Sequence, residues 1–225
     1  MLQFRTRVKI CCIANTQEAA IAIRYGADAI GLVGAMPSGP GIITDETARQ
    51  IATELSPPVA SFLLTSETTA KKISEHVLDV GASTIQIVSH IDPEESAKLA
   101  KLIPMIKRVQ VIHVEDDACL CLMEDYQAYY NAFLLDSGKP SAKIPELGGT
   151  GRTHDWNISK QIIGKSDLPV FLAGGLTPQN VGDAITRLRP YGIDLCSGVR
   201  TENKLNEAKL SAFMNAVHLA DQQIR

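Results

Sequence analysis

The repeating unit of this chain is clearest in residues 26–33, which read GADAIGLV. Gly26 suits the left-handed residue that ends a helix, and the apolar run that follows has the length of a strand. The run is apolar on both faces and precedes a stretch with helical spacing, which is typical of a parallel βα unit. Glycine leads into an apolar run again at Gly81 and Gly192. The pattern therefore predicts parallel strands that alternate with helices.

Apolar runs of strand length alternate with amphipathic stretches from one end of the chain to the other. Eight βα units in 225 residues predict one (β/α)8 barrel domain over residues 1–225, near the lower limit of length for that fold. An open doubly wound sheet is the alternative, but no G-x-G-x-x-G follows the first run. The runs are residues 8–12, 29–33, 59–64, 84–88, 109–113, 132–136, 170–173 and 193–197.

Three helix starts are marked by capping residues. Asn15 lies three residues before Glu18, the spacing of a helix cap and the third helical residue. Asp92-Pro93 and Thr177-Pro178 each place a capping side chain before a proline that suits the first helical position. We expect helices to begin at these three places.

Composition excludes several classes of partner. The 22 basic and 25 acidic residues give a net charge of -3, too balanced for the basic footprint of a nucleic-acid-binding protein. The sequence has no run of about 18 apolar residues, and residues 1–10 carry charges where a signal peptide is apolar. None of the five cysteines is in a C-x-x-C motif, which favours reduced thiols without a metal site. We expect a cytoplasmic protein that binds neither nucleic acid nor membrane.

The first run carries a lysine and a cysteine on one face. In a barrel, reactive groups lie at the carboxyl ends of strands, and Lys9 and Cys11 have the same parity. If both point inward, the ammonium lies about 6–7 Å from the thiol and favours its thiolate form. The alternative is that Cys11 is a small core residue. Asp194 shares parity with Cys196 in the last run, and its carboxylate would balance a buried Lys9.

The sixth run ends in Asp136, and three later segments are rich in glycine. A carboxyl group at the barrel mouth is partly desolvated and can stay protonated as a general acid, although it can also cap a loop. Segments 148–151, 173–176 and 197–199 offer backbone N–H groups near the last strands, where barrels hold phosphate. Tight turns are the alternative for any one of them. The candidate phosphate-site residues are Gly149, Thr150, Gly151, Gly174, Gly175, Ser197 and Gly198.

Taken in order, these motifs resemble the phosphoribosylanthranilate isomerase family over nearly the whole chain. They are VKIC at 8–11, GADAIG at 26–31, LLDS at 134–137, GGTG at 148–151, DW at 155–156, LAGGL at 172–176 and DLCSGV at 194–199. The resemblance implies a (β/α)8 enzyme of tryptophan biosynthesis that uses no metal or organic cofactor. Its substrate would be a small phosphorylated sugar-amine, and the protein would be a monomer or a homodimer.

The resemblance also implies roles for two residues in an Amadori rearrangement. By matching position, Asp136 would be the general acid that protonates the ribose ring oxygen and opens the ring to a Schiff base. Cys11 would be the general base that removes the C2 proton, giving an enolamine that tautomerises to the ketone. Such chemistry needs a proton donor and a proton acceptor on opposite sides of the sugar.

The chain departs from the family pattern at three places. The family's Ser-Pro-Arg after the second strand, whose arginine is placed to meet the anthranilate carboxylate, is replaced by MPSGPGI at residues 36–42, and Arg152 is a candidate substitute. The family's Gln-Leu-His-Gly reads QIVS at residues 86–89, and Cys12 replaces the usual glycine beside the base. Two alternatives follow: an isomerase acting on a different phosphoribosylamine, and a non-catalytic barrel that binds a phosphosugar.

Overall fold

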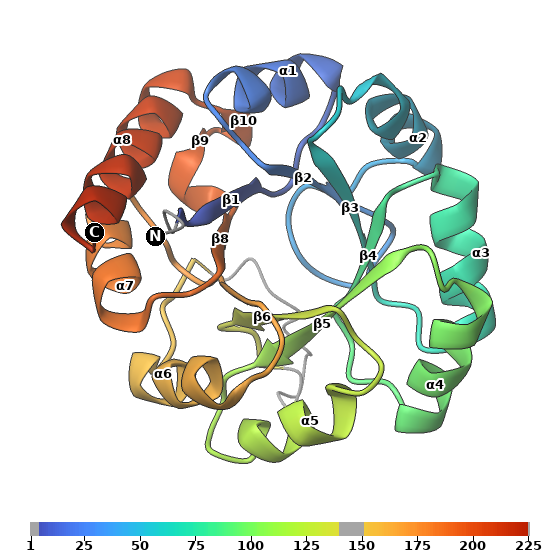
Figure 1. Ribbon diagram of the computed structural model, residues 1–225. Helices are drawn as coiled ribbons and strands as arrows, with labels where there is room; N and C mark the ends of the chain where they lie inside the picture. The colour runs from blue at the N-terminus through green and yellow to red at the C-terminus, as the bar shows by residue number, and fades with distance from the viewer. Residues whose placement is uncertain (1–4, 140–150, 225) are drawn as a thin grey trace.

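The computed structural model describes residues 5–139 and 151–224 and confirms the predicted (β/α)8 barrel. Each parallel strand pairs with the next strand in the chain, and β8 closes the barrel against β1. The helices form an outer ring around the strands (Figure 1). The barrel strands are β1 (Arg7–Ile10), β2 (Ala29–Val33), β3 (Ala60–Thr65), β4 (Thr84–Ile87), β5 (Lys107–His113), β6 (Ala132–Asp136), β7 (Val170–Leu172) and β8 (Gly192–Leu195).

The helices and the short elements after β8 complete the fold. The helices are α1 (Thr16–Arg24), α2 (Asp45–Glu54), α3 (Ala70–Val80), α4 (Pro93–Leu102), α5 (Cys119–Tyr126), α6 (Trp156–Lys165), α7 (Val181–Leu188) and α8 (Glu207–Gln223). A 3-10 turn, η1 (Ser197–Val199), leads into a hairpin of β9 (Arg200–Thr201) and β10 (Lys204–Leu205). None of the described helices combines the length and the apolarity that crossing a membrane requires.

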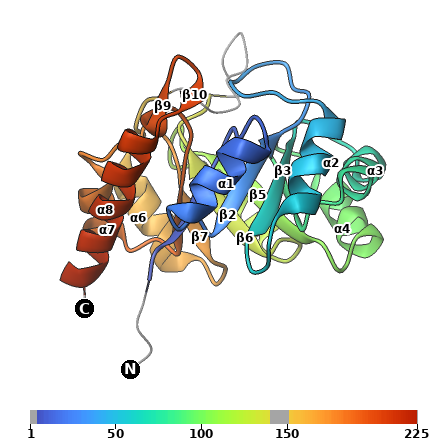
Figure 2. The ribbon, with the colours of Figure 1, turned by 90° about the horizontal axis from the view of Figure 1, so that it is seen from above.

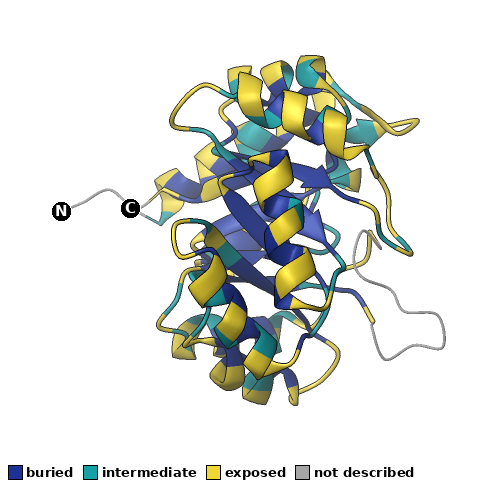
Figure 3. Cartoon of the chain, turned by 90° about the vertical axis from the view of Figure 1, so that its right-hand side faces the viewer, coloured by how far each residue is buried: buried dark blue, intermediate teal, exposed yellow. Residues whose placement is uncertain are grey.

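Successive residues of each strand face two different hydrophobic clusters. In β6, Ala132 and Leu134 belong to the cluster inside the barrel, whereas Phe133 and Leu135 belong to the layer between strands and helices. Figure 3 shows the buried strands enclosed by helices whose outer faces are exposed. Because side chains alternate along a strand, the next inward position after Leu134 is Asp136. The barrel thereby directs this carboxyl group toward the mouth at the carboxyl ends of the strands.

Two of the three predicted helix starts are confirmed. The Asn15 side chain accepts a hydrogen bond from the backbone N–H of Glu18 at the start of α1, and Asp92 caps α4, whose first residue is Pro93. The third prediction, at Thr177, is wrong because α7 begins at Val181. The Asn180 side chain accepts from the N–H of Thr177 at 2.8 Å, which holds residues 177–180 in a turn before the helix.

Glycine ends the helices at two of the three predicted positions. Gly26 and Gly81 have φ of 97° and 74°, in the left-handed region. Gly192 does not have this role, because it begins β8 and the left-handed residue after α7 is Arg189, with φ of 51°. A β-carbon at Gly192 would lie 2.6 Å from Cε1 of Phe171, so glycine is required there by close packing.

The loops after the strands gather at one end of the barrel. In Figure 2 the β9–β10 hairpin and the loop between β2 and α2 lie at this end, and the last turn of α8 lies at the other. The end of the barrel that carries these loops is where a substrate site is expected.

The predicted strand runs correspond to the eight barrel strands, with ends that differ by at most two residues.

Candidate active site

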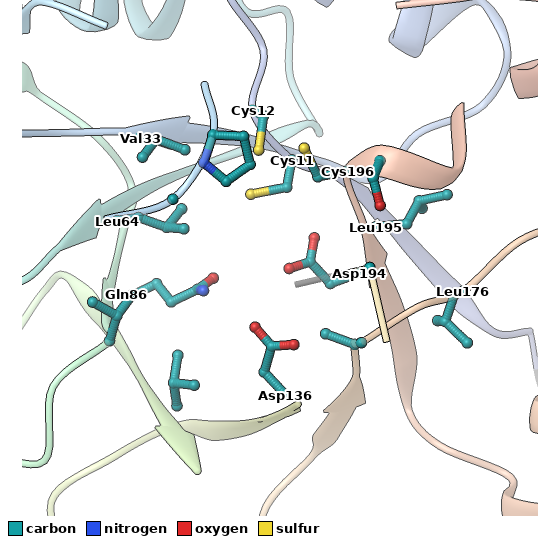
Figure 4. A pocket seen from close by; sticks show the side chains of 18 of the residues that line it. Cys11, Cys12, Val33, Leu64, Gln86, Asp136, Leu176, Asp194, Leu195 and Cys196 are labelled. Carbon is teal, nitrogen blue, oxygen red and sulfur yellow. The ribbon is translucent and has the colours of Figure 1, made fainter. Parts of the chain in front are cut away.

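The carboxyl ends of the strands surround a cavity that is partly open to solvent. Cys11, Asp136 and Asp194 line it, and Figure 4 shows their side chains extending into the same space from β1, β6 and β8. The structure therefore brings together residues that lie far apart in the chain. Four of the predicted phosphate-site residues also line the cavity, namely Gly151, Gly174, Gly175 and Ser197.

Lys9 and Asp194 form an ion pair at the base of the cavity. The two residues are register partners on β1 and β8, and Lys9 Nζ lies 2.9 Å from Asp194 Oδ1. The Lys9 side chain is fully buried. Burial opposes the ammonium charge, but Asp194 and then Cys11 outweigh it and hold the pKa of Lys9 above its usual value. Lys9 therefore places a permanent positive charge beneath the thiol.

Space for the Cys11 thiol comes from a glycine in the neighbouring strand. A β-carbon at Gly31 of β2 would lie 2.7 Å from Cys11 Sγ and 3.0 Å from Lys9 Nζ. Any larger residue would displace one of these two groups. A glycine inside a strand is a signal of close approach, and Gly31 is a functional position that sequence reasoning missed.

The environment of Cys11 favours its thiolate. A hydrogen bond from the Cys12 thiol is the main cause that lowers the pKa of Cys11, burial opposes it, and Lys9 adds to the lowering. The sequence pointed to Lys9 alone, whereas the structure places Cys12 ahead of it. The contrast with Cys119 of α5 is large, because burial raises the pKa of that thiol to about 11. Cys11 is thus the more acidic thiol of the two.

A buried ion pair fixes the backbone beside Cys11. Cys12 has a left-handed φ of 62°, and the guanidinium of Arg200 donates a hydrogen bond to its carbonyl oxygen. Arg200 Nη2 in turn lies 2.8 Å from Glu18 Oε2, and the other oxygen of Glu18 accepts from the N–H of Leu205. This contact between α1 and β9 was missed by sequence reasoning, because the partners are 182 residues apart.

Asp136 has the environment of a general acid. Protein surrounds the carboxyl group except on the side of the cavity, and this burial raises the pKa of Asp136 above its ordinary value. The N–H of Ser137 donates to Asp136 Oδ1 at 2.7 Å and partly opposes the shift. A carboxyl group that keeps its proton to higher pH can deliver it to a substrate oxygen.

The glycine-rich segments after β6, β7 and β8 pack against one another. A β-carbon at Gly175 would lie 2.6 Å from the carbonyl carbon of Arg152, and one at Gly198 would lie 2.1 Å from the carbonyl oxygen of Leu176. Glycine is therefore what lets the three backbones converge. A β-carbon at Gly151 would lie 3.7 Å from Ser197 Oγ, which is an ordinary van der Waals distance, so packing does not require glycine at that position. Gly149 and Thr150, which were also predicted here, lie outside the described residues.

His154, in the loop that precedes α6, supports one of these glycine segments. Its Nε2 lies 2.6 Å from Ser159 Oγ of α6, and its Nδ1 would lie 3.1 Å from a β-carbon at Gly174. Burial lowers the pKa of His154 to about 4, so the ring is neutral at pH 7. This histidine packs beneath the cavity wall as an uncharged side chain.

The opposite wall of the cavity is formed by the loop between β2 and α2. Met36, Ser38, Gly39 and Pro40 line it, and no lysine or arginine occurs among the described lining residues. Arg152, the candidate partner for a substrate carboxylate, is exposed and does not belong to this lining. The described part of this wall therefore carries no guanidinium.

Gln86 is a further polar residue of the wall that sequence reasoning did not single out. It lies on β4, is 3% exposed and lines the cavity. Its amide oxygen has no hydrogen-bond partner among the described residues, and Figure 4 shows the side chain extending toward the cavity. Its parity with Thr84 on an otherwise apolar strand is the signal that marks it. The Gln86 amide is placed to bind a hydroxyl group of a ligand.

Comparison with known proteins agrees with this arrangement. Residues 8–216 match the family model described as N-(5'phosphoribosyl)anthranilate (PRA) isomerase. A relative of that name from Methanocella arvoryzae is 35% identical over 91% of this chain and 94% of its own length. The crystal structure of the isomerase from Thermotoga maritima is 28% identical, with a TM-score of 0.81 over 95% of this chain and 98% of that one.

A further solved structure of such an isomerase contains a ligand. It is a complex with reduced 1-(o-carboxyphenylamino)-1-deoxyribulose 5-phosphate, 27% identical to this chain, with a TM-score of 0.78 over 95% of this chain and 98% of the other. The match to the family model covers nearly the whole barrel, from β1 to α8. The chain therefore belongs to the N-(5'-phosphoribosyl)anthranilate isomerase family.

Proposed function

We propose that this protein converts N-(5-phosphoribosyl)anthranilate to 1-(2-carboxyphenylamino)-1-deoxyribulose 5-phosphate in tryptophan biosynthesis. The observation that carries the proposal is the pair of Cys11 and Asp136 in one cavity. The pKa of the first is lowered and that of the second is raised. An acid and a base with displaced pKa values are what proton transfer in two directions requires.

In the proposed mechanism, Asp136 acts first and Cys11 second. The protonated Asp136 donates to the ribose ring oxygen, which breaks the bond from C1 to that oxygen and leaves a Schiff base. The Cys11 thiolate then removes the C2 proton and gives an enolamine. Tautomerisation of the enolamine yields the ketone. Lys9 lowers the cost of the negative thiolate in a buried site, and Asp194 neutralises Lys9 when Cys11 is protonated.

The converging segments after β6, β7 and β8 are the proposed phosphate site. Backbone N–H groups of turns rich in left-handed glycine bind anions, and Gly174 and Gly175 have φ of 82° and 60°. Ser197 adds a hydroxyl group at the start of η1. The ligand in the solved relative carries the same 5-phosphate and carboxyphenylamino groups as the proposed product. An anchored phosphate would hold C1 and C2 between Asp136 and Cys11.

Complementation of a tryptophan auxotroph that lacks the isomerase tests this function. The wild-type chain is expected to restore growth without tryptophan, and Cys11→Ala and Asp136→Ala are expected not to. Cys121→Ser, which changes an exposed thiol of α5, is the matched control and should grow as wild type does. Growth of both alanine variants at the wild-type rate would favour a non-catalytic phosphosugar-binding barrel.

A second candidate keeps the chemistry and changes the amine. It is favoured by the wall of residues 36–40, where the described lining offers no guanidinium for the anthranilate carboxylate. The purified protein would be supplied with the phosphoribosylamine of aniline, which lacks that carboxylate, and with that of anthranilate. Faster turnover of the aniline compound would support the second candidate. Turnover of the anthranilate compound alone would exclude it.

A further inference from the structure

Three of the five cysteines meet at the proposed active site. Cys11, Cys12 and Cys196 all line the cavity, and Figure 4 shows their sulfur atoms gathered at its edge. Cys12 occupies the middle of the group, because Cys11 and Cys196 both interact with its thiol and raise its pKa. The proposed reaction uses only Cys11. Two further thiols in the cavity wall beside the proposed base thus call for a separate explanation.

The fold makes special room for the thiol of Cys12. Its φ of 62° is a conformation that glycine adopts without strain and other residues rarely adopt. A β-carbon at Gly41, in the loop before α2, would lie 2.4 Å from Cys12 Cβ. The Arg200–Glu18 pair holds the Cys12 carbonyl and thereby fixes this backbone. A side chain is therefore kept at a left-handed position, which points to a use for the thiol.

The three thiols differ in acidity and in exposure. Cys11 is the thiolate-prone sulfur, and thiolates are the form that peroxides oxidise. The pKa of Cys12 is raised well above the usual value by its hydrogen bonds to Cys11 and Cys196 and by burial, so this thiol keeps its proton. Cys196 is half-buried and is the more exposed end of the group. An oxidised Cys11 would therefore have a protonated thiol in contact with it.

We propose that Cys11, Cys12 and Cys196 form a site of reversible oxidation by hydroperoxides. The Cys11 thiolate attacks the terminal peroxide oxygen, the O–O bond breaks, and the alkoxide that leaves takes a proton from water. Cys11 is then a sulfenic acid. The Cys12 sulfur attacks the Cys11 sulfur, the S–O bond breaks, and hydroxide leaves as water with the Cys12 proton. The hydroperoxide is reduced to an alcohol, and two thiols are oxidised to one disulfide.

Cys196 completes the sequence by thiol–disulfide exchange. It loses its proton to solvent and attacks the Cys12 sulfur, so that a Cys12–Cys196 bond forms and Cys11 leaves as a thiolate. Cys11 is a good leaving group because its pKa is lowered. The ends of β1 and β8 lie side by side, with Ile10 and Leu195 as register partners. Cys11 and Cys196 directly follow these partners and Cys12 is one residue further along, so this pairing brings the chain ends that carry all three thiols together.

This inference concerns the chemistry of the thiols and does not depend on the isomerase activity. Its consequence for that activity is protective, since a disulfide with Cys12 would keep Cys11 from irreversible oxidation to a sulfinic acid.

Trypsin places the relevant cysteines in separate peptides. Residues 10–24 carry Cys11 and Cys12, residues 188–200 carry Cys196, and the thiols of α5 lie in a third peptide.

The experiment treats the full-length wild type and three variants with tert-butyl hydroperoxide and maps the peptides by mass spectrometry. The wild type should show peptides 10–24 and 188–200 joined by a disulfide that dithiothreitol cleaves. Cys196→Ser should instead show peptide 10–24 with two hydrogens fewer, from a Cys11–Cys12 bond. Cys12→Gly, which suits the left-handed backbone, should show Cys11 with two added oxygens and no disulfide. Cys12→Ala is a second variant for the same comparison, and thermal unfolding checks that each variant is folded.

Recovery after reduction gives the second readout. After treatment with dithiothreitol, the wild type should regain most of the isomerase activity that it had before oxidation. Cys12→Gly should regain less than a tenth of the activity that it had before oxidation. Cys121→Ser should recover as wild type does. Direct conversion of wild-type Cys11 to a sulfinic acid, or equal recovery of Cys12→Gly and wild type, would overturn the proposal. The mass readout remains decisive if the protein proves inactive as an isomerase.

Discussion

Replacing Asp194 by Asn should cost about 3–5 kcal/mol of unfolding free energy, because it leaves the ammonium of Lys9 buried without a partner. The Lys9 side chain has 0% exposure, and its Nζ lies 2.9 Å from the carboxylate. At an effective dielectric constant of about 20, the attraction over this distance is about 6 kcal/mol. Desolvation of both ions offsets much of it when the pair is intact. Removal of one partner leaves the Lys9 desolvation uncompensated.

Urea unfolding at pH 7 measures the loss, and an exposed ion pair supplies the control. Arg49 Nη2 lies 2.6 Å from Asp79 Oδ2, closer than the buried pair, but the two side chains are 44% and 60% exposed. Asp79→Asn should therefore cost no more than about 1 kcal/mol. Since the pKa of Lys9 is raised in the folded state, the contribution of the pair is complete below its ordinary value of 10.5. The loss on Asp194→Asn should thus be the same at pH 6 and pH 8.

A small loss of unfolding free energy, or a loss equal to that of the exposed pair, would refute this reasoning. If Asp194→Asn lost less than about 1 kcal/mol, or no more than Asp79→Asn, burial would not be what makes the Lys9 pair important. The charge beneath Cys11 would then need another explanation. Cys11 alkylation in Asp194→Asn gives an independent check, because a change in the Lys9 charge must alter the acidity of the neighbouring thiol.

Three further predictions concern the proposed acid, the proposed base and its neighbouring glycine. Because burial raises the pKa of Asp136, kcat should fall as pH rises through that pKa, and Asp136→Asn should lower kcat by about 10²–10⁴ and abolish that limb of the pH profile. Iodoacetamide should alkylate Cys11 faster than Cys119 at pH 7, since the pKa of Cys119 is raised to about 11; equal rates by peptide mapping would contradict this. Gly31→Ala should destabilise the protein by about 1–3 kcal/mol in urea and lower kcat, because its β-carbon would lie 2.7 Å from Cys11 Sγ. A fully active, equally stable variant would show that the thiol can shift freely.

Much of the barrel follows from local sequence. The bounds of β2 and β6 match the apolar runs, because a strand buried on both faces is marked along its whole length. The start of α7 was misplaced because the Asn180 side chain accepts from the N–H of Thr177 and holds residues 177–180 in a turn, although Thr177-Pro178 has the pattern of a helix start. Local capping rules fail where the capping residue is engaged by a turn instead of the helix.

The candidate site also contains features that local sequence predicts and features that it does not. Side-chain parity predicted that Lys9 and Asp194 both point into the barrel. The register of β1 with β8 then pairs these two residues directly. The Arg200–Glu18 pair depends on packing between distant segments, so no local pattern marks it. A glycine inside a strand signals a close approach at Gly31, but it does not identify Cys11 as the neighbour. The influence of Cys12 on Cys11 depends on a left-handed backbone that only the folded loop reveals.

The most direct test of the central claim is the turnover of freshly prepared N-(5-phosphoribosyl)anthranilate, followed as the loss of anthranilate-type fluorescence. The wild type should consume the substrate, and Cys11→Ser and Asp136→Asn should each be slower by about 10²–10⁴ in kcat. Absence of turnover by the wild type at high enzyme concentration would contradict the claim. So would variants that both react within tenfold of the wild-type rate.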